Sequence, residues 1–286
     1  MKGGTLAVII VSYNTREHTL ECLRRLEKNT RLPHRVIIID NASRDGSQTL
    51  LKGWSRKRRG RVIFIQNKDN KGFARACNQG LELVDAGEYV CLLNSDLMVP
   101  SGWALRLRDH FSDTDRVGAV GPLGRGIGGF QNYTSFYPAP GYPVQDFPPG
   151  PAFDRFAARV YVQQQGWFRT VKYLMGCCLL ISPRALKQVG GLDEAYFCGA
   201  DDFDWSVRAR LQGFDLVAAH DLYVWHQIGA STSKEEPETL EKYRHQGWNH
   251  FNHKWKHVFP DHSWEQHFVS EVELDTPRFR LHYRHH

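Results

Sequence analysis

Short apolar runs alternate with helical stripes through the first third of the chain. Each run is continuous in apolar residues, as expected for a strand that is covered on both faces. Between the runs, leucines and other apolar residues recur at helical spacing. This strand–helix order predicts a parallel sheet with right-handed crossovers, which makes the chain an α/β protein. The predicted strands span residues 6–11, 35–39, 62–65 and 88–93.

Polar residues follow each of these four predicted strands. Ligands of open parallel sheets bind beyond the carboxyl ends of the strands. Polar side chains at all four ends should therefore converge on one edge of the sheet, where core packing would not require them. This pattern predicts a binding site built from residues 12–14, 40–41, 67–70 and 94–96.

The pattern changes at about residue 117. The segment 121–150 is rich in glycine, proline and aromatic residues and has little periodicity, which predicts a mobile loop near the site. The chain would then consist of two halves, 1–120 and 121–232, and a C-terminal helical extension, 233–286. Beyond the loop we expect a buried strand at 175–181, a helix at 201–213, one or two strands at 216–225 and a long helix at 237–258.

Composition narrows the class of protein. The 286 residues are 41% hydrophobic and 24% charged, which excludes a disordered or collagen-like chain. No apolar run approaches the ~18 residues of a membrane span, and the start of the chain lacks the features of a secretory signal. The six cysteines contain no CxxC pair, so we expect buried thiols and a cytoplasmic location.

The net charge of +6 favours anionic partners such as nucleotide diphosphates, phospholipid head groups or nucleic acid, without choosing among them. Much of the excess lies in the basic run 56–61. That run is interpreted first as a solvated loop after a helix, and second as a patch that touches a membrane or an acidic acceptor.

Several carboxylates are candidates for chemistry. Asp96 directly follows an apolar strand, where it could bind a divalent cation and a diphosphate or merely cap a helix. Asp40 also ends a strand, and could accept a hydrogen bond from a nucleobase or ribose or simply form a turn. Asp201, Asp202 and Asp204 lie close enough to repel one another, which suits a general base, although acids in a first helical turn also suit the helix dipole.

Histidines and loops give weaker signals. His226 follows a strand and could ligate a metal or contact phosphate, or be structural. Four histidines on the predicted tail helix favour a solvated or interfacial face over a metal site. No G-x-S-x-G or GKS/GKT element is present, which disfavours a serine hydrolase or a P-loop enzyme.

Seven segments, in order and at suitable spacing, resemble glycosyltransferase family 2, the inverting nucleotide-sugar enzymes with the GT-A fold. The resemblance is strongest to the bacterial rhamnosyltransferase-like branch. The segments are VIIVSYN (8–14), VIIIDNASRDGS (36–47), NKGFARACNQG (70–80), LLNSDLMV (92–99), MGCCLLISPRALKQVGGLDEAYF (175–197), DDFDWSVRAR (201–210) and WHQIGAS (225–231).

The resemblance implies a GT-A type Rossmann-like, mostly parallel sheet flanked by helices. Residues 1–120 would bind the nucleotide-sugar donor, and 121–232 would bind the acceptor and catalyse. Asp202 would be the catalytic base, with Asp201 and Asp204 beside it. Asp96 and His226 would hold Mg or Mn. The donor would be bound by Ser12, Tyr13, Asn14, Asp40, Asn70, Gly72, Phe73, Asn78, Asn94 and Ser95.

Three positions depart from the family pattern. The usual glutamate before the base is Asp201, which is one methylene shorter. A frequent tyrosine before that pair is replaced by Gly199, and the first position of the DxD-type element is Asn94.

The implied reaction is a single displacement that moves rhamnose or another hexose from a UDP or dTDP donor. The acceptor would be a glycan, a lipid-linked molecule or another hydroxyl compound in polysaccharide biosynthesis, and nucleic acid would not be a partner. A catalytically silent sugar-binding protein is the alternative. A nucleotidyltransferase is disfavoured because residues 12–14 lack its glycine-rich basic loop. The tail helix could form a homodimer or lie peripherally at the inner face of a membrane, and we favour the dimer.

Overall fold

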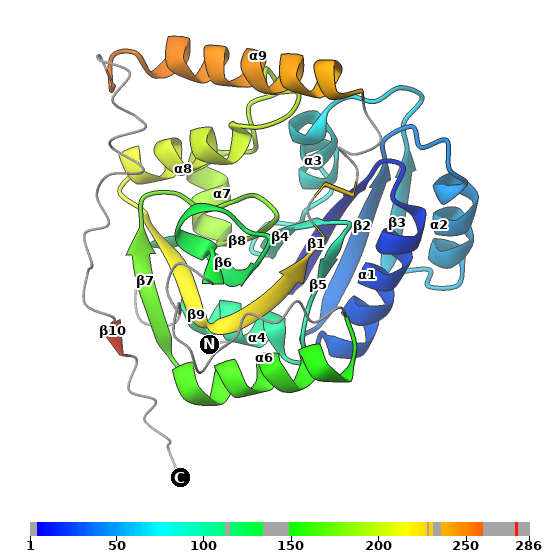
Figure 1. Ribbon diagram of the computed structural model, residues 1–286, viewed down its shortest axis with the longest axis horizontal. Coiled ribbons are helices and arrows are strands. Elements are labelled where there is room, and N and C mark those ends of the chain that lie inside the picture. Colours follow the sequence, from blue (N-terminus) through cyan, green and yellow to red (C-terminus); the bar gives the residue numbers. More distant parts are fainter. Residues whose placement is uncertain are drawn as a thin grey trace.

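The computed structural model describes residues 5–111, 115–133, 149–227, 229–230, 236–259 and 278–279 (Figure 1). The four strands expected in the first third of the chain are present, with helices between them. The strands are β1 (Leu6–Ser12), β2 (His34–Asp40), β3 (Val62–Gln66), β4 (Tyr89–Asn94), β5 (Leu97–Met98), β6 (Val117–Arg125), β7 (Trp167–Val171), β8 (Cys178–Ile181), β9 (Asp215–His226) and β10 (Arg278–Phe279).

Helices connect the strands and cover both faces of the sheet. Three of them begin with proline, which suits the first turn of a helix: α6 (Pro151–Gln164), α7 (Pro183–Val189) and α9 (Pro237–Trp255). The others are α1 (Arg16–Asn29), α2 (Ser47–Arg56), α3 (Phe73–Leu81), α4 (Trp103–Asp109), the short 3₁₀ turn η1 (Gly129–Gln131) and α8 (Asp201–Leu211).

The sheet has the strand order β10-β7-β9-β6-β8-β4-β1-β2-β3, with β5 paired to β9. Strands β4, β1, β2 and β3 run parallel to one another, whereas β8 runs antiparallel to both β4 and β6. The chain builds outward from β1 to β3 and then returns to place β4 on the other side of β1. Such a reversal opens a crevice at the carboxyl ends of β1 and β4, where ligands bind in doubly wound sheets.

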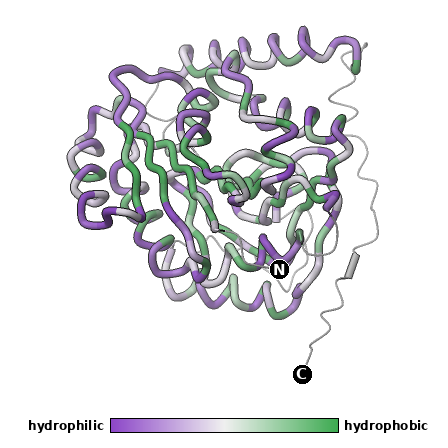
Figure 2. The backbone as a smooth tube through the Cα atoms, turned by 180° about the vertical axis from the view of Figure 1, so that it is seen from behind, coloured by the Kyte–Doolittle hydropathy of each residue, from purple (hydrophilic) through white to green (hydrophobic). Residues whose placement is uncertain are grey.

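The two faces of the sheet carry separate cores. Successive side chains of a strand point to opposite faces. In β1, Val8 and Ile10 pack with α1, α2, α4 and α6, while Ala7 and Ile9 pack with α3, α7 and α8. Figure 2 shows hydrophobic residues, in green, mainly along the central strands and hydrophilic residues, in purple, mainly on the outer helices. The result is a mostly parallel sheet flanked by helices.

The expectation of a loop from residue 121 onward is wrong for its first part. Residues 121–125 belong to β6, whose residues are buried as far as Gly124. Its glycines reflect crowding and not mobility: a Cβ on Gly118 would lie 2.7 Å from Phe214, and one on Gly121 would clash with Gln131. Residues 134–148, the centre of the predicted loop, lie outside the described residues. Besides β6, five elements in or near this part of the chain were not predicted: β5, α4, η1, α6 and β7.

The C-terminal helical extension packs on the rest of the fold. In Figure 1, α9 lies across the top of the molecule, above α8 and α3. Phe251 is buried together with Tyr196 and Val207 in a third, smaller core between α8 and α9. The two halves that were predicted to divide at residue 120 both contribute strands to one sheet. Their separate roles in donor and acceptor binding stay a prediction. Among the described residues, no helix has the length and apolar character needed to cross a membrane.

Candidate active site

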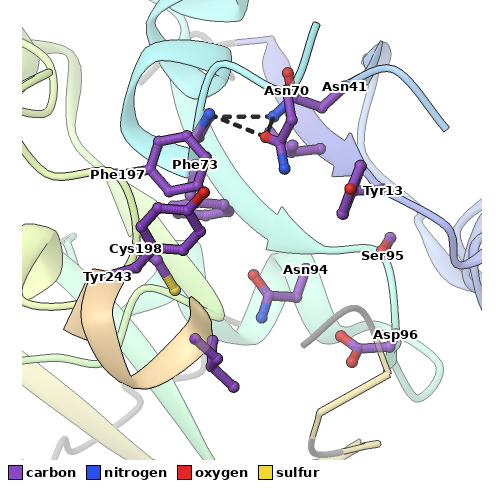
Figure 3. A pocket seen from close by; sticks show the side chains of 13 residues that line it. Tyr13, Asn41, Asn70, Phe73, Asn94, Ser95, Asp96, Phe197, Cys198 and Tyr243 are labelled. Atoms are coloured by element: carbon purple, nitrogen blue, oxygen red, sulfur yellow. Dashed lines mark hydrogen bonds between the residues drawn. The ribbon is translucent and has the colours of Figure 1, made fainter. Parts of the chain in front are cut away.

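A cavity lies at the crevice between the carboxyl ends of β1 and β4 (Figure 3). Tyr13 follows β1, and Asn94, Ser95 and Asp96 end and follow β4. Figure 3 shows Tyr13, Ser95 and Asp96 on one side and a group of aromatic side chains on the other. The full lining is Val11, Tyr13, Asn41, Asn70, Gly72, Phe73, Asn94, Ser95, Asp96, Phe197, Cys198, Leu240 and Tyr243.

Asn41 holds the upper rim of this cavity in shape. Its Nδ2 donates to Oδ1 of Asn70 over 2.7 Å and to the carbonyl of Gly72 over 3.3 Å. Its Oδ1 accepts from the backbone N–H of Lys71 and from Nδ2 of Asn67. One amide therefore satisfies several polar groups of the turn before α3 and positions Asn70 at the rim.

Gly72 makes a close approach that no other residue could make. Its φ is +80°, and a Cβ there would lie 2.7 Å from the carbonyl oxygen of Phe197. That oxygen accepts the N–H of Phe73 over 3.0 Å. The turn before α3 is thus pressed against the segment that leads to Asp201 and Asp202.

A carboxylate–imidazole pair lies at the edge of the cavity, which Asp96 lines and His226 does not. Oδ1 of Asp96 lies 3.2 Å from Nε2 of His226, and Nδ2 of Asn94 lies 3.3 Å from the same nitrogen. Nδ1 of His226 donates to the carbonyl of Gly126 over 2.8 Å. Burial lowers the pKa of His226, but the hydrogen bond and charge of Asp96 raise it, and the net pKa is raised.

These residues fit a divalent cation. A metal-binding histidine usually donates its other N–H to a carbonyl or carboxylate, as His226 does to Gly126. Its Nε2 and the Asp96 carboxylate then point at a common place beside Asn94. Mg and Mn are often held by one or two carboxylates plus phosphate oxygens of a substrate. Among the described residues, no group of three or more His, Cys, Asp or Glu side chains is arranged to hold a metal ion.

Asp40 ends β2 and is fully buried. Its Oδ2 accepts the N–H of Ser43 over 3.2 Å, while its Oδ1 has no hydrogen-bond partner within the described part of the chain. Burial raises the pKa of this carboxyl above its ordinary value. An acceptor oxygen without a partner is suited to an N–H of a bound base, although Asp40 does not itself line the cavity.

Asp201 and Asp202 begin α8 with raised pKa values. Burial, and then the neighbouring charge of Asp202, raises the pKa of Asp201 to about 8. Burial also raises the pKa of Asp202, against two hydrogen bonds that oppose the rise. Those bonds come from the N–H of Gly176 to Oδ2 and the N–H of Phe203 to Oδ1, each over 2.9 Å. A carboxylate with a raised pKa and a fixed orientation is a suitable general base.

Hydrogen bonds connect the segments that carry Asp96 and Asp202, although only Asp96 lines the cavity. The N–H of Asn94 donates to the carbonyl of Cys177, and the next residue back, Gly176, donates to Asp202. Burial raises the pKa of the Cys177 thiol well above its ordinary value, and the charges of Asp202 and Asp96 both add to the rise. Cys177, which immediately precedes β8, is therefore near enough to both carboxylates for their charges to act on it.

Asp204 has contacts of a different kind. Its side chain is fully buried, and its Oδ2 accepts Nε of Arg208 over 2.8 Å. Its Oδ1 lies 2.7 Å from Nζ of Lys254 and 3.0 Å from Nε1 of Trp255. These contacts connect α8 to α9 and occupy both carboxylate oxygens of Asp204. The catalytic role expected for Asp204 stays a prediction.

Three further predicted donor residues lie outside the cavity lining. Oγ of Ser12 contacts Oγ1 of Thr19 over 3.0 Å in a buried hydroxyl cluster. Oδ1 of Asn14 accepts the N–H of Arg44 over 2.7 Å. Asn78 pairs with both the N–H and the carbonyl of Leu192, which fastens α3 to the loop before α8. Each supports the backbone around the site.

Some cavity residues were not predicted. Asn41 was noted only as a polar strand end, although its place in the turn after β2 makes it a natural support. Phe197 ends a quoted motif without a role of its own, and Cys198 lies between two quoted motifs. Leu240 and Tyr243 lie on α9, three residues apart and thus on one helical face, but nothing in that spacing indicates what the face contacts.

Comparisons with known proteins agree with this geometry. The profile of Glycosyl transferase family 2 matches residues 7–190, which is more than half of the chain. The N-acetylglucosaminyl-diphospho-decaprenol L-rhamnosyltransferase of Mycobacterium tuberculosis is 28% identical over 276 residues, covering 85% of this chain and 86% of the relative. Glycosyltransferase AglE of Haloferax volcanii is 24% identical over 241 residues, covering 83% of this chain and 70% of the relative.

Solved structures share the fold. The mannosyltransferase PcManGT from Pyrobaculum calidifontis, in complex with GDP-Man and Mn²⁺, has a TM-score of 0.56 at 19% identity over 77% of this chain. GalNAc-T7 with UDP, GalNAc and Mn²⁺ has a TM-score of 0.60 at 18% identity over 78% of this chain. The chain spans 56% and 43% of the lengths of these two proteins. The fold is of the GT-A type, as predicted.

The chain belongs to glycosyl transferase family 2, in its rhamnosyltransferase-like branch.

Proposed function

We propose that this glycosyltransferase moves a hexose, with inversion, from a nucleoside-diphosphate donor to a hydroxyl group. The observation that carries the proposal is the pairing of Asp96, which lines the cavity, with His226. Hydrogen bonds from Asn94 to Cys177 and from Gly176 to Asp202 connect this pair to the start of α8. Asp96 would hold a cation and the diphosphate, and Asp202 would face the acceptor.

The donor would bind across the crevice. Tyr13 and Asp40 flank the place for the base, and the unsatisfied Oδ1 of Asp40 would accept a base N–H. The diphosphate would lie beside Asn94 and Ser95, where Asp96 and His226 would hold Mg or Mn. When bound, the ion would neutralise the negative charge that the diphosphate gains as it leaves.

Asp202 would be the base for the acceptor. Its carboxylate takes the proton of the acceptor hydroxyl while that oxygen forms a bond to the anomeric carbon. The bond from that carbon to the diphosphate oxygen breaks, and the electron pair leaves with the nucleoside diphosphate. The N–H groups of Gly176 and Phe203 hold the carboxylate in place throughout.

The sugar and acceptor are proposed from a relative. The mycobacterial protein is named for transfer of L-rhamnose to a decaprenol-linked diphospho-sugar. The match covers most of both proteins. It therefore supports dTDP-rhamnose as the first donor to test and a lipid-linked diphosphate as the first acceptor. Such an acceptor would bring the protein into peripheral contact with a membrane, and the net charge of +6 would favour an anionic surface.

A direct test measures donor binding to Asp96→Asn. Calorimetric titration of the wild type with dTDP-rhamnose and UDP-glucose, each with Mn²⁺, should reveal binding of at least one. Asp96→Asn should weaken that binding at least about tenfold, in the range seen when metal-site groups are removed. Asp85→Asn is a matched control, because the Asp85 side chain is 84% exposed and lies outside the cavity lining. Equal affinities for the wild type and Asp96→Asn would contradict the assignment.

The same titration tests the alternative, a silent sugar-binding protein. A binding protein would bind the nucleotide sugar but release neither nucleoside diphosphate nor glycosylated acceptor. Turnover with a polyprenyl-diphosphate-linked sugar would exclude it.

A further inference from the structure

The N-terminal half of α9 forms one wall of the donor cavity. Leu240 and Tyr243 are both cavity-lining residues, although they follow the catalytic α8 by about thirty positions. The opposite side of the cavity is polar, formed by Asn94, Ser95 and Asp96 (Figure 3). The cavity therefore has one face for a charged group and one apolar face that α9 completes.

This wall is fastened to the segment before α8. The ring of Tyr243 packs on the ring of Phe197, with centroids 4.2 Å apart. One turn later, Gly247 lets α9 come close: a Cβ there would lie 2.7 Å from the carbonyl oxygen of Gly199. Farther along, Nζ of Lys254 lies 2.6 Å from Asp193 and 2.7 Å from Asp204. Three positions along α9, namely Tyr243, Gly247 and Lys254, therefore contact the loop before α8 or α8 itself.

The position of the wall decides which part of the donor it meets. Tyr13 and Asn41 follow β1 and β2, on the side where the base would lie. Phe197 and Cys198 instead precede Asp201 and Asp202 directly in the chain. A sugar that is attacked between Asp96 and Asp202 must lie on this second side. Leu240 and Tyr243 close the cavity there.

The chemistry of the wall indicates what it recognises. Phe73, Phe197, Leu240 and Tyr243 present rings and an aliphatic side chain, and none of them carries a charge. Such a surface matches the C–H face of a pyranose, or the methyl edge of a deoxy sugar, and leaves a carboxylate or an extra hydroxyl without a partner.

We propose that Leu240 and Tyr243 are specificity-determining residues of the donor site, which contact the donor sugar and favour one with an apolar edge. The proposal rests on the proposed function and gives the C-terminal helix a role that neither the family motifs nor the relatives assign.

The test compares a nucleotide sugar with its own nucleoside diphosphate. Wild type, Tyr243→Ala, Leu240→Ser and His245→Ala are titrated with dTDP and dTDP-rhamnose, and with UDP and UDP-glucose, all with Mn²⁺. His245 is exposed on the same helix and serves as the control. Thermal denaturation of each variant shows whether it is folded, and Leu240→Ser provides a second change if Tyr243→Ala is not.

The expected result is a selective loss. Tyr243→Ala and Leu240→Ser should bind the preferred nucleotide sugar about three- to tenfold more weakly, the range for one aromatic or apolar contact. Their affinity for the matching nucleoside diphosphate should stay within about twofold of the wild type, as should every affinity of His245→Ala. An equal loss of affinity for the nucleotide sugar and the nucleoside diphosphate, or no loss for either, would overturn this inference. The proposed function would still stand. If the wild type bound none of the four ligands, the proposed function would fail as well.

Discussion

Replacing Asp201 with asparagine should stabilise the fold, and increasingly so as the pH rises. The side chain is 6% exposed, and burial followed by the charge of Asp202 raises its pKa from 3.8 to about 8. Between these two values the folded chain keeps a proton that the unfolded chain has released. Because the folded state binds more protons, the free energy of unfolding falls as the pH rises through this window.

The magnitude follows from that one proton. It changes the free energy of unfolding by about 1.4 kcal/mol per pH unit, so the carboxyl lowers wild-type stability by about 3 kcal/mol between pH 5 and pH 7. Asp201→Asn removes the titrating group and keeps a side-chain oxygen for the backbone N–H groups around it. Relative to the wild type, the variant should gain roughly this amount over the same interval.

Urea unfolding followed by tryptophan fluorescence at pH 5 and pH 7 measures the difference. Asp193→Asn is a control with the opposite sign. Burial acts to raise the pKa of Asp193, but the hydrogen bond from Lys254 lowers it to about 2, so this carboxylate is ionised in both states above pH 5. Asp193→Asn should therefore destabilise equally at both pH values. A difference between Asp201→Asn and the wild type that does not change with pH would refute the reasoning.

Two further changes test how the site is supported. Lys254→Met leaves Asp204 and Asp193 without one cationic partner and should lower the free energy of unfolding by about 2 kcal/mol, measured in urea against the exposed control His253→Ala. Gly72→Ala adds a Cβ 2.7 Å from the carbonyl oxygen of Phe197 at a φ of +80°, whereas Gly60→Ala has a similar φ of +85° and open space. Thermal denaturation should show a larger fall in melting temperature for Gly72→Ala than for Gly60→Ala. Gly72→Ala should also bind the nucleotide sugar more weakly. Equal losses would mean that φ alone matters, and that the close approach does not.

The first half of the fold was predictable because its signals are local. Each of β1 to β4 is a continuous apolar run, and each is followed by polar residues at the same edge of the sheet. The order of strands and helices then limits the topology, and the crevice between β1 and β4 follows from it. Tyr13, Asn70 and the segment 94–96 were accordingly expected at one place, while Gly72 and Phe73 were implied by the family resemblance. All of them line the cavity.

The rest of the site depends on contacts between distant residues. A strand that must contain glycine because Phe214 and Gln131 fill the space beside it has the composition of a loop, so β6 was missed. The helix α9 was predicted, but its contacts with Phe197 and Asp204 arise only when the chain is folded. For the same reason Asp204 could not be separated from Asp201 and Asp202 by sequence alone.

The central claim is that Asp202 acts on the acceptor and not on the donor. The most direct measurement compares the turnover number and donor affinity of Asp202→Asn with those of the wild type, using the nucleotide sugar that binds and a lipid-linked acceptor. Turnover should fall by roughly 10²- to 10⁴-fold, the usual contribution of a general base, while the dissociation constant for the donor changes by less than about threefold. Wild-type turnover, or a loss of donor binding as large as the loss of turnover, would contradict the account.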